Sequence, residues 1–320
     1  MTKLAILGCG NIARFHVPAM KSSGFKISAI SGRPKTEDYL NNFALEFGLK
    51  DTIIFGDPID LIESDNWDAI LISCPANVML NYLELALKKN KPILAEKPIS
   101  YKSDELKKFL KYKNVKVAYN RRFYKTVEYA KKFLIEHKSS IIKVTIPESS
   151  DEICDSKYFP DRLPIKSYEN SVHMIDLIRY LLGEISWSFK KSTKNNTNYK
   201  ALVGIGESEN GNLIVLDSCF NSSDNFAIQI ISDSKKLELR PIETAYFFDG
   251  MKVIEPTKDI PIRAYTPTLI DKIIETDIDN IKLGFRSQAI DFKNFCDGKS
   301  SNAATIYDSY RALQLIEALK

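Results

Sequence analysis

The first third of the chain alternates short apolar runs with segments of helical period. The apolar runs predict strands at residues 4–7, 27–30, 53–55, 69–72, 92–95 and 115–118, and the segments between them predict helices at 12–20, 36–47, 78–89 and 103–112. The run at 69–72 is apolar at every position, as expected of a central parallel strand covered on both faces. Strands that alternate with helices in this way predict an α/β domain with a doubly wound parallel sheet.

The rhythm changes after Asn120. A helix is expected at 126–136, a strand at 141–146, an irregular segment at 147–165 and a helix at 168–182. Consecutive strands without helices between them follow at 186–191, 201–206, 213–220, 226–232 and 236–240, before helices at 285–295 and 305–319. This order predicts an α+β domain with a mainly antiparallel sheet over residues 121–320, after a first domain over residues 1–120.

Composition excludes several classes of function. The net charge is only +4 and is spread along the 320 residues, so nothing indicates a nucleic-acid partner. No segment approaches the roughly 20 apolar residues of a membrane helix, and no signal-peptide pattern is present. The five cysteines are widely spaced without a Cys-x-x-Cys pair, which is typical of reduced thiols and not of a zinc site. We therefore expect a cytoplasmic protein without a metal centre.

A glycine motif follows the first predicted strand. The sequence Gly8-Cys9-Gly10-Asn11-Ile12-Ala13 fits Gly-x-Gly-x-x-Ala and opens the first helix. Glycines there permit a tight turn and let backbone N–H groups approach a pyrophosphate at the positive end of the helix. An ordinary strand-to-helix turn is the alternative, but the position within a run of βα units favours a dinucleotide-binding Rossmann domain. Gly8, Gly10, Asn11 and Ile12 are the predicted contacts.

The end of the second strand bears on the choice of cofactor. An Asp or Glu usually stands about 20 residues after the glycines and binds the ribose 2′-OH of NAD. This chain has Ser31-Gly32-Arg33-Pro34 instead. Without a carboxylate, Arg33 and Ser31 can bind a 2′-phosphate, so NADP is slightly favoured over NAD. If Arg33 only stacks on the adenine, either cofactor would serve.

Candidate chemistry stands at the carboxyl ends of two further strands, where ligands of open α/β sheets bind. Cys74 and Pro75 follow one strand, and Glu96 and Lys97 follow the next, so all four are expected to line the cofactor crevice. The ammonium of Lys97 can hydrogen-bond a substrate hydroxyl and stabilise a developing alkoxide. A solvated surface lysine is the alternative. Cys74 is more simply explained as a small buried side chain than as a nucleophile.

Four motifs in register carry a family resemblance. They are Gly-x-Gly-x-x-Ala, Glu96-Lys97-Pro98, Asn120-Arg121-Arg122-Phe123 and the helix end Asp176-Leu177-Ile178-Arg179-Tyr180-Leu181-Leu182-Gly183-Glu184. Together they resemble the Gfo/Idh/MocA oxidoreductases over essentially the whole chain. The resemblance implies sugar or cyclitol substrates and a homodimer or homotetramer that pairs through the C-terminal sheet. It also implies that Lys97 contacts both substrate and nicotinamide, and that the bond before Pro98 is cis.

The helix at 168–182 supplies the predicted base. The family usually reads Asp-x-x-x-His-x-x-Asp there, and this chain has Glu169, His173 and Asp176, so Glu169 carries one extra methylene. Residues three or four apart share a helix face, and a carboxylate beside an imidazole raises its basicity and orients the ring. His173 is the expected general base and Glu169 its orienting group. A partly buried, capped histidine is the alternative; His16 and His137 show no such setting in the sequence.

Further residues are candidates for the substrate pocket. Arg121 and Arg122 can each grip a carboxylate or phosphate, or each form an interdomain salt bridge. Met79 stands where the family often has His and cannot donate a hydrogen bond. The remaining candidates are Asn120, Tyr158 and Asn170, with weaker support for Tyr119 and Tyr124.

These observations predict an NAD(P)-dependent enzyme that transfers a hydride between nicotinamide and a hydroxyl or keto carbon of a sugar, nucleotide sugar or cyclitol. One alternative is a regulatory protein that binds dinucleotide without turnover. Another is a reductase of a cyclic imine or tetrapyrrole on the same fold, which a large apolar pocket would favour. The strand at 212–220 reads as apolar on both faces, which indicates a covering partner.

Overall fold

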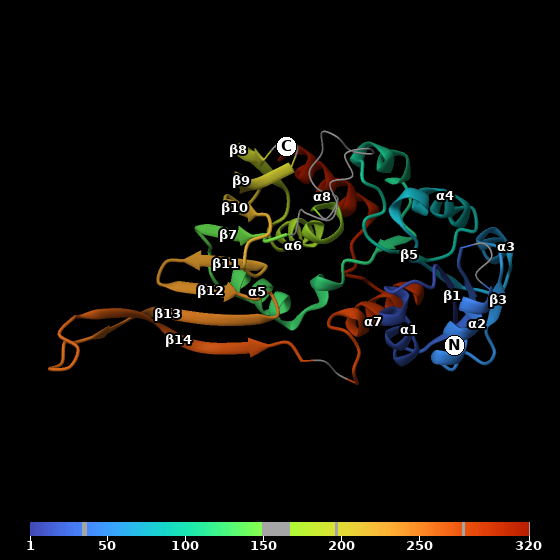
Figure 1. Ribbon diagram of the computed structural model, residues 1–320, viewed down its shortest axis with the longest axis horizontal. Coiled ribbons are helices and arrows are strands. Elements are labelled where there is room, and N and C mark those ends of the chain that lie inside the picture. Colours follow the sequence, from blue (N-terminus) through green and yellow to red (C-terminus); the bar gives the residue numbers. More distant parts are fainter. Residues whose placement is uncertain (34–36, 149–166, 196–197, 277–278, 320) are drawn as a thin grey trace. The chain divides into compact units, whose positions relative to one another are not determined.

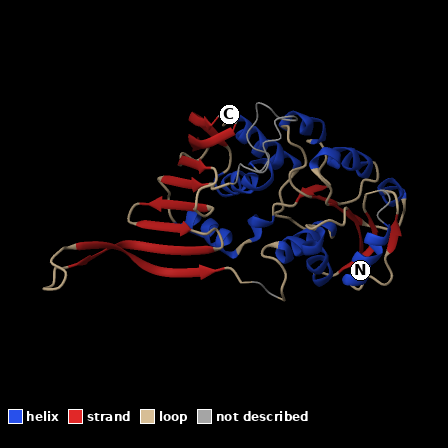
Figure 2. Ribbon diagram, in the orientation of Figure 1, coloured by secondary structure: helices blue, strands red, loops and turns tan. Residues whose placement is uncertain are grey.

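A computed structural model describes residues 1–33, 37–148, 167–195, 198–276 and 279–319 (Figure 1). The chain divides into two compact units. The first comprises Met1–Phe123 and Asp277–Gln314, and the second comprises Tyr124–Thr276 and Leu315–Lys320. Each unit is built around its own sheet (Figure 2).

The sheet of the first unit is parallel throughout, in the order β3-β2-β1-β4-β5-β6. Its strands are β1 (Thr2–Leu7), β2 (Phe25–Ser31), β3 (Ile53–Phe55), β4 (Ala69–Ile72), β5 (Ile93–Ala95) and β6 (Val115–Val117). Its helices are α1 (Ala13–Ser22), α2 (Glu37–Glu46), α3 (Pro58–Glu63), α4 (Ala76–Leu87), the 3₁₀ helices η1 (Ser103–Phe109) and η2 (Asn120–Phe123), and α7 (Phe285–Cys296). The doubly wound sheet predicted from the sequence is confirmed. Strand order reverses between β1 and β4, which is where such sheets bind ligands.

Two local features of this unit differ from the sequence expectation. The short helix α3 was not expected; Asp57 caps it by accepting a hydrogen bond from the Ile59 amide (2.7 Å), and Pro58 occupies its first position. The segment expected as an α-helix at 103–112 is a 3₁₀ helix over Ser103–Phe109.

The first unit is completed by a late return of the chain. Phe285 and Phe292 of α7 join the buried cluster that also contains Leu4 of β1 and Val17 of α1. Val117 forms an antiparallel bridge with Ala304, whose carbonyl accepts from the Val117 amide at 2.8 Å. A single division at residue 120 does not anticipate this return, because apolar periodicity predicts a helix but not the sheet against which it packs.

The second unit has an eight-stranded sheet in the order β14-β13-β12-β11-β7-β10-β9-β8. Among the described strands of this sheet, only the β7–β10 pair is parallel, so the expected mainly antiparallel sheet is confirmed. Its strands are β7 (Ile141–Thr145), β8 (Ile185–Asn195), β9 (Asn198–Ser208), β10 (Leu213–Cys219), β11 (Ala227–Ser232), β12 (Lys235–Leu239), β13 (Thr244–Ile254) and β14 (Ala264–Ile274). Its helical segments are α5 (Lys125–Glu136), a π-helical turn η3 (Ser167–Ser171) and α6 (Val172–Leu182); α8 (Ile306–Ala318) follows late in the chain.

One face of this sheet is exposed. Strand β10 alternates, with Ile214, Leu216 and Ser218 buried and Leu213 and Cys219 exposed. The expectation that residues 212–220 are apolar on both faces is therefore corrected, since the exposed side also carries Asp217. That side is nevertheless partly apolar on the neighbouring strands.

The β13–β14 hairpin was not expected from the sequence. Within β13, the segment Ala245–Asp249 pairs with β12 on one side. The rest of the β13 ladder pairs with β14 alone. This ribbon extends beyond its neighbours as the long orange arm of Figure 1. Its tip region exposes several large apolar side chains: Met251, Val253, Ile254, Ile260, Ile262, Tyr265 and Leu269.

Candidate functional site

The glycine loop is held by close backbone packing at the end of β1. Gly8 has φ +97°, and a Cβ there would lie 2.6 Å from the carbonyl oxygen of Ser73. The Gly8 amide donates to the Ser31 carbonyl (2.8 Å), and the Ser73 hydroxyl donates to the Gly8 carbonyl (2.6 Å). The loop thus joins the ends of β2 and β4 across β1, and only glycine fits at its first position.

Gly10 differs from Gly8 in a way that indicates a ligand. It is exposed, and a Cβ built there would meet no protein atom within 4 Å, so packing does not require glycine. The following helix α1 has Ile12 as its N-cap, with no side-chain cap and no acidic residue in the first turn. Helix amides without a cap attract anions. The loop therefore fits the pyrophosphate of a dinucleotide, with Asn11 and Ile12 beside it.

The end of β2 corrects one prediction. Ser31 is fully buried, and its hydroxyl donates to the Phe55 carbonyl at 2.9 Å. Its side chain therefore ties β2 to β3 and is not available to a 2′-phosphate. Arg33 is exposed, and it remains the candidate for that contact.

The end of β4 carries Cys74 and Pro75. Burial raises the pKa of the Cys74 thiol to about 12, so the sulfur is held as a thiol, and it lies 4.0 Å from the sulfur of Met79. Such a thiol is a weak nucleophile, which agrees with the interpretation of Cys74 as a packing residue. Pro75 is the N-cap residue of α4.

The end of β5 carries Glu96 and Lys97. The Glu96 amide donates to the Ile72 carbonyl (2.8 Å), which holds the segment to β4. Glu96 is buried, and its Oε2 accepts from the Lys97 amide at 3.1 Å. Lys97 is half-buried, and the Lys97–Pro98 bond is cis, as the family resemblance implied.

A buried histidine–carboxylate contact lies next to this segment. His16 Nε2 stands 2.6 Å from Glu96 Oε1, and neither side chain is exposed by more than 8%. The expectation that His16 has no carboxylate neighbour is therefore wrong. Its partner is 80 residues away in sequence, and spacing along one helix cannot reveal such a contact.

The residues after β6 serve the first unit itself. Asn120 is buried, and its Nδ2 donates to the Leu283 carbonyl at 3.0 Å. Arg122 is buried against Asp308 (3.5 Å) and donates to the Asn302 carbonyl (3.4 Å). Arg122 was predicted either to bind a carboxylate or phosphate of the substrate or to form a salt bridge between domains. Its guanidinium instead forms an ion pair with Asp308, and both residues belong to the first unit. Arg121 is half-buried.

Two tyrosine candidates are also placed. Tyr119 is buried, with its hydroxyl 3.4 Å from that of Ser309, so it packs inside the first unit. Tyr124 is buried in the second unit. Tyr158 lies outside the described residues.

The candidate base lies in the second unit. His173 and Asp176 are buried on α6, and Glu169 and Asn170 are half-buried in the π-helical turn before it. A π turn bonds residues five apart, so the α-helical spacing assumed between Glu169 and His173 does not hold in this turn.

The sequence did not single out Glu148, which lies just after β7. It is buried and accepts hydrogen bonds from Ser171 Oγ (3.1 Å) and Asn170 Nδ2 (3.4 Å). A carboxylate thus stands behind one predicted substrate contact, Asn170. A single Glu after a strand gives no signal of this contact, because its partners lie more than 20 residues on.

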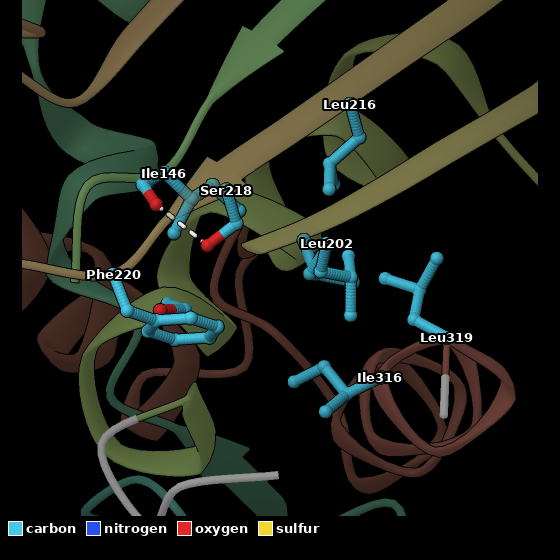
Figure 3. A pocket seen from close by; sticks show the side chains of 9 residues that line it. Ile146, Leu202, Leu216, Ser218, Phe220, Ile316 and Leu319 are labelled. Atoms are coloured by element: carbon cyan, nitrogen blue, oxygen red, sulfur yellow. Dashed lines mark hydrogen bonds between the residues drawn. The ribbon is translucent and has the colours of Figure 1, made fainter. Parts of the chain in front are cut away.

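A small cavity lies inside the second unit, between the buried face of the sheet and helix α6 (Figure 3). Its volume is about 30 Å³. Its lining is apolar except for two serines, and Ser218 donates to the Ile146 carbonyl at 2.7 Å. The lining residues are Ile146, Ser171, Ile175, Leu202, Leu216, Ser218, Phe220, Ile316 and Leu319. A space of roughly one water molecule cannot admit a sugar or a tetrapyrrole.

Comparison with known proteins shows a likeness to one family of oxidoreductases. Residues 2–120 match the GFO_IDH_MocA oxidoreductase family, described as having an NAD-binding Rossmann fold. The inositol 2-dehydrogenase/D-chiro-inositol 3-dehydrogenase of Halalkalibacterium halodurans is 24% identical over 308 residues, covering 88% of this chain and 83% of that protein. Over residues 2–120 the chain is therefore similar to the Gfo/Idh/MocA oxidoreductases. The glucose-6-phosphate 3-dehydrogenase of Bacillus subtilis is 24% identical to this chain over 337 residues, covering 91% of this chain and 94% of that protein.

Solved structures support the fold of this chain. A levoglucosan dehydrogenase in complex with NADH and levoglucosan aligns with a TM-score of 0.76 at 16% identity, covering 99% of this chain and 95% of that one. Within the described ranges, no group of His, Cys, Asp and Glu side chains could hold a metal ion. No helix among those residues is long and apolar enough to cross a membrane.

The two glycines of the loop provide a matched pair of substitutions. Gly8→Ala should lower the free energy of unfolding by roughly 1–3 kcal/mol from backbone strain alone, with the Ser73 clash in addition. Gly10→Ala should leave the melting temperature unchanged but weaken dinucleotide binding about 10-fold or more, because its Cβ occupies the pyrophosphate space. Thermal unfolding and titration of reduced dinucleotide fluorescence measure the two effects. Wild-type dinucleotide affinity in Gly10→Ala would contradict the assignment of this loop.

Proposed function

We propose that this oxidoreductase transfers a hydride between the nicotinamide of NAD(P) and a hydroxyl-bearing carbon of a sugar, nucleotide sugar or cyclitol. The observation that carries the proposal is the position of Lys97 at the end of β5, on the sheet edge that also holds the glycine loop. The relatives named inositol 2-dehydrogenase and glucose-6-phosphate 3-dehydrogenase support a polyol or phosphosugar substrate.

The residues of the chain have separate tasks in this proposal. Lys97 donates a hydrogen bond to the substrate oxygen and stabilises negative charge on it. His173 accepts the hydroxyl proton in oxidation and returns it in reduction, and Glu169 orients that base or a neighbouring hydroxyl. The bound nicotinamide supplies or receives the hydride.

Substitution of the two principal groups tests this assignment. Lys97→Ala and His173→Ala should each lower kcat about 100-fold or more, because a positioned proton-transfer or charge-stabilising group contributes 10²–10⁴-fold. Dinucleotide affinity should change less than about 3-fold. The assay screens sugars, cyclitols and nucleotide sugars with NAD and NADP at the nicotinamide absorbance band.

Matched controls are the exposed Lys102→Ala and the half-buried His137→Ala, which should keep wild-type kcat. If the two active-site variants turned over as fast as these controls, the assignment would be wrong. Dinucleotide binding without turnover of any polyol would instead favour a regulatory protein.

We infer a slight preference for NADP from the exposed Arg33 and the absence of a carboxylate at the end of β2. Arg33→Ala should weaken NADP binding about 10-fold or more, because a charge-assisted hydrogen bond contributes roughly 1.5–3 kcal/mol, and should leave NAD binding unchanged. Fluorescence titrations with both reduced cofactors measure the difference. Equal losses for both would mean that Arg33 stacks on the adenine.

We propose that the exposed face of the second unit's sheet pairs with a second copy, giving a homodimer or homotetramer. Ile205 of β9 lies between Phe189 of β8 and Val215 of β10 in the ladder, and Phe189 and Ile205 are exposed. A contiguous apolar patch on a sheet face is typical of an interface.

Charge on that patch should break the assembly. The pair Phe189→Glu and Ile205→Glu should raise the dissociation constant at least about 10-fold, because buried interface residues often contribute more than 1.4 kcal/mol. Light scattering across a dilution series measures the mass. Leu45→Glu, at an exposed apolar position of the first unit, is the control. An unchanged mass in the double variant would contradict pairing through this face.

A further inference from the structure

We infer that His16 is a positioning residue that holds Lys97 in place through Glu96. The inference rests on the proposed function, in which Lys97 contacts the substrate oxygen. His16 belongs to helix α1 and Glu96 to the end of β5, so the contact joins the helix after the glycine loop to the strand that presents the lysine.

One carboxylate makes both contacts. Glu96 Oε1 lies 2.6 Å from His16 Nε2, and Glu96 Oε2 lies 3.1 Å from the Lys97 amide nitrogen. The first contact fixes the orientation of the carboxylate, and the second transfers that orientation to the backbone of Lys97. The Lys97 side chain starts from that backbone.

His16 is itself held rigidly. Its side chain is fully buried, its amide donates to the Ile12 carbonyl (3.3 Å), and its ring packs edge-on against Phe285 at 4.7 Å between centroids. Because a buried carboxylate needs a donor, Nε2 carries the proton that faces Glu96. Nδ1 has no hydrogen-bond partner among the described residues, so Glu96 is the only described side chain that this ring serves through a hydrogen bond.

This arrangement explains why a buried histidine stands in a helix that otherwise only presents a dinucleotide loop. A buried contact between polar side chains is weak evidence of stabilisation, since the cost of desolvation offsets much of its attraction. It does fix geometry, and a misplacement of about 1 Å at a catalytic group can cost 100-fold in rate. The pair therefore affects the rate through Lys97 rather than the affinity for the dinucleotide.

The test compares variants that keep or remove the donor to Glu96. His16→Gln places an amide N–H near the position of Nε2, whereas His16→Leu removes the donor. The double variant His16→Leu, Glu96→Leu removes both partners and leaves no buried charge unpaired, so it tests the inference if the single variant does not fold. Ser28→Ala is the matched control, because Ser28 is a buried residue of the same unit and the substitution deletes its part-buried hydrogen bond to the Asn66 carbonyl, at 2.6 Å.

Two readouts are needed in each folded variant. The first is kcat and KM with the best polyol from the screen, together with the dissociation constant of the dinucleotide. The second is the rate at which trace acetic anhydride acetylates Lys97 in the dinucleotide-saturated protein, followed by peptide mass spectrometry with the exposed Lys26 as internal reference.

We expect His16→Leu and the double variant to lose roughly 10- to 100-fold in kcat with dinucleotide affinity within about 3-fold of wild type. The acetylation rate of Lys97 should change at least about 3-fold relative to Lys26, and His16→Gln should recover most of both effects. Wild-type kcat and labelling in a folded His16→Leu or double variant would overturn the inference. So would equal losses in Ser28→Ala, which would indicate stability alone.

The labelling separates this inference from the proposed function. If the wild-type protein oxidises or reduces no polyol, the proposed function fails, and the acetylation rates alone decide whether His16 positions Lys97. If turnover is found and the acetylation rate of Lys97 is the same in the His16 variants as in the wild type, the proposed function stands and the positioning role fails.

Discussion

The backbone of Gly8 and the carbonyl of Ser73 approach so closely that a single methyl group would not fit between them. This contact fixes how the ends of β1 and β4 meet at the reversal of strand order. Because Ser73 also donates to the Gly8 carbonyl, the loop has little freedom to move away. The start of α1, and with it the space beside Gly10, follows from this one constraint.

The remaining site features of the first unit occupy the same sheet edge. Strand β4 lies between β1 and β5 and is completely buried, so the segments that follow β4 and β5 leave a closely packed part of the sheet. Hydrogen bonds across the strand ends, such as that from the Glu96 amide to the Ile72 carbonyl, hold the backbone in place for one or two residues beyond the sheet. The position of Lys97 thus depends on packing that the apolar core provides.

Much of this architecture could be read from the sequence because it is local. Apolar runs such as 69–72 predicted the parallel strands, and the glycine spacing predicted the loop. The hairpin of β13 and β14 was missed because most of β14 and the end of β13, Met251–Ile254, are exposed. These residues therefore lack the alternation of buried and exposed positions that marks a half-buried strand.

Contacts between side chains of distant segments were the second kind of feature that the sequence could not predict. His16 with Glu96, and Arg122 with Asp308, are joined only by the fold. Ser31 shows the same limit between neighbouring strands. Nothing in the sequence motif reveals that its hydroxyl donates a hydrogen bond to the Phe55 carbonyl of β3. The roles of Glu169 and His173 stay predictions.

The return of α7 to the first unit has a consequence for biosynthesis. Ile281, Phe285, Ala289 and Phe292 complete a buried cluster whose other members lie within residues 4–118. During translation, the nucleotide-binding half therefore remains unfinished until the whole sheet of the second unit has emerged from the ribosome. A nascent chain that ends near residue 250 still lacks α7, so the apolar side of α1 that packs against α7 is uncovered at that stage.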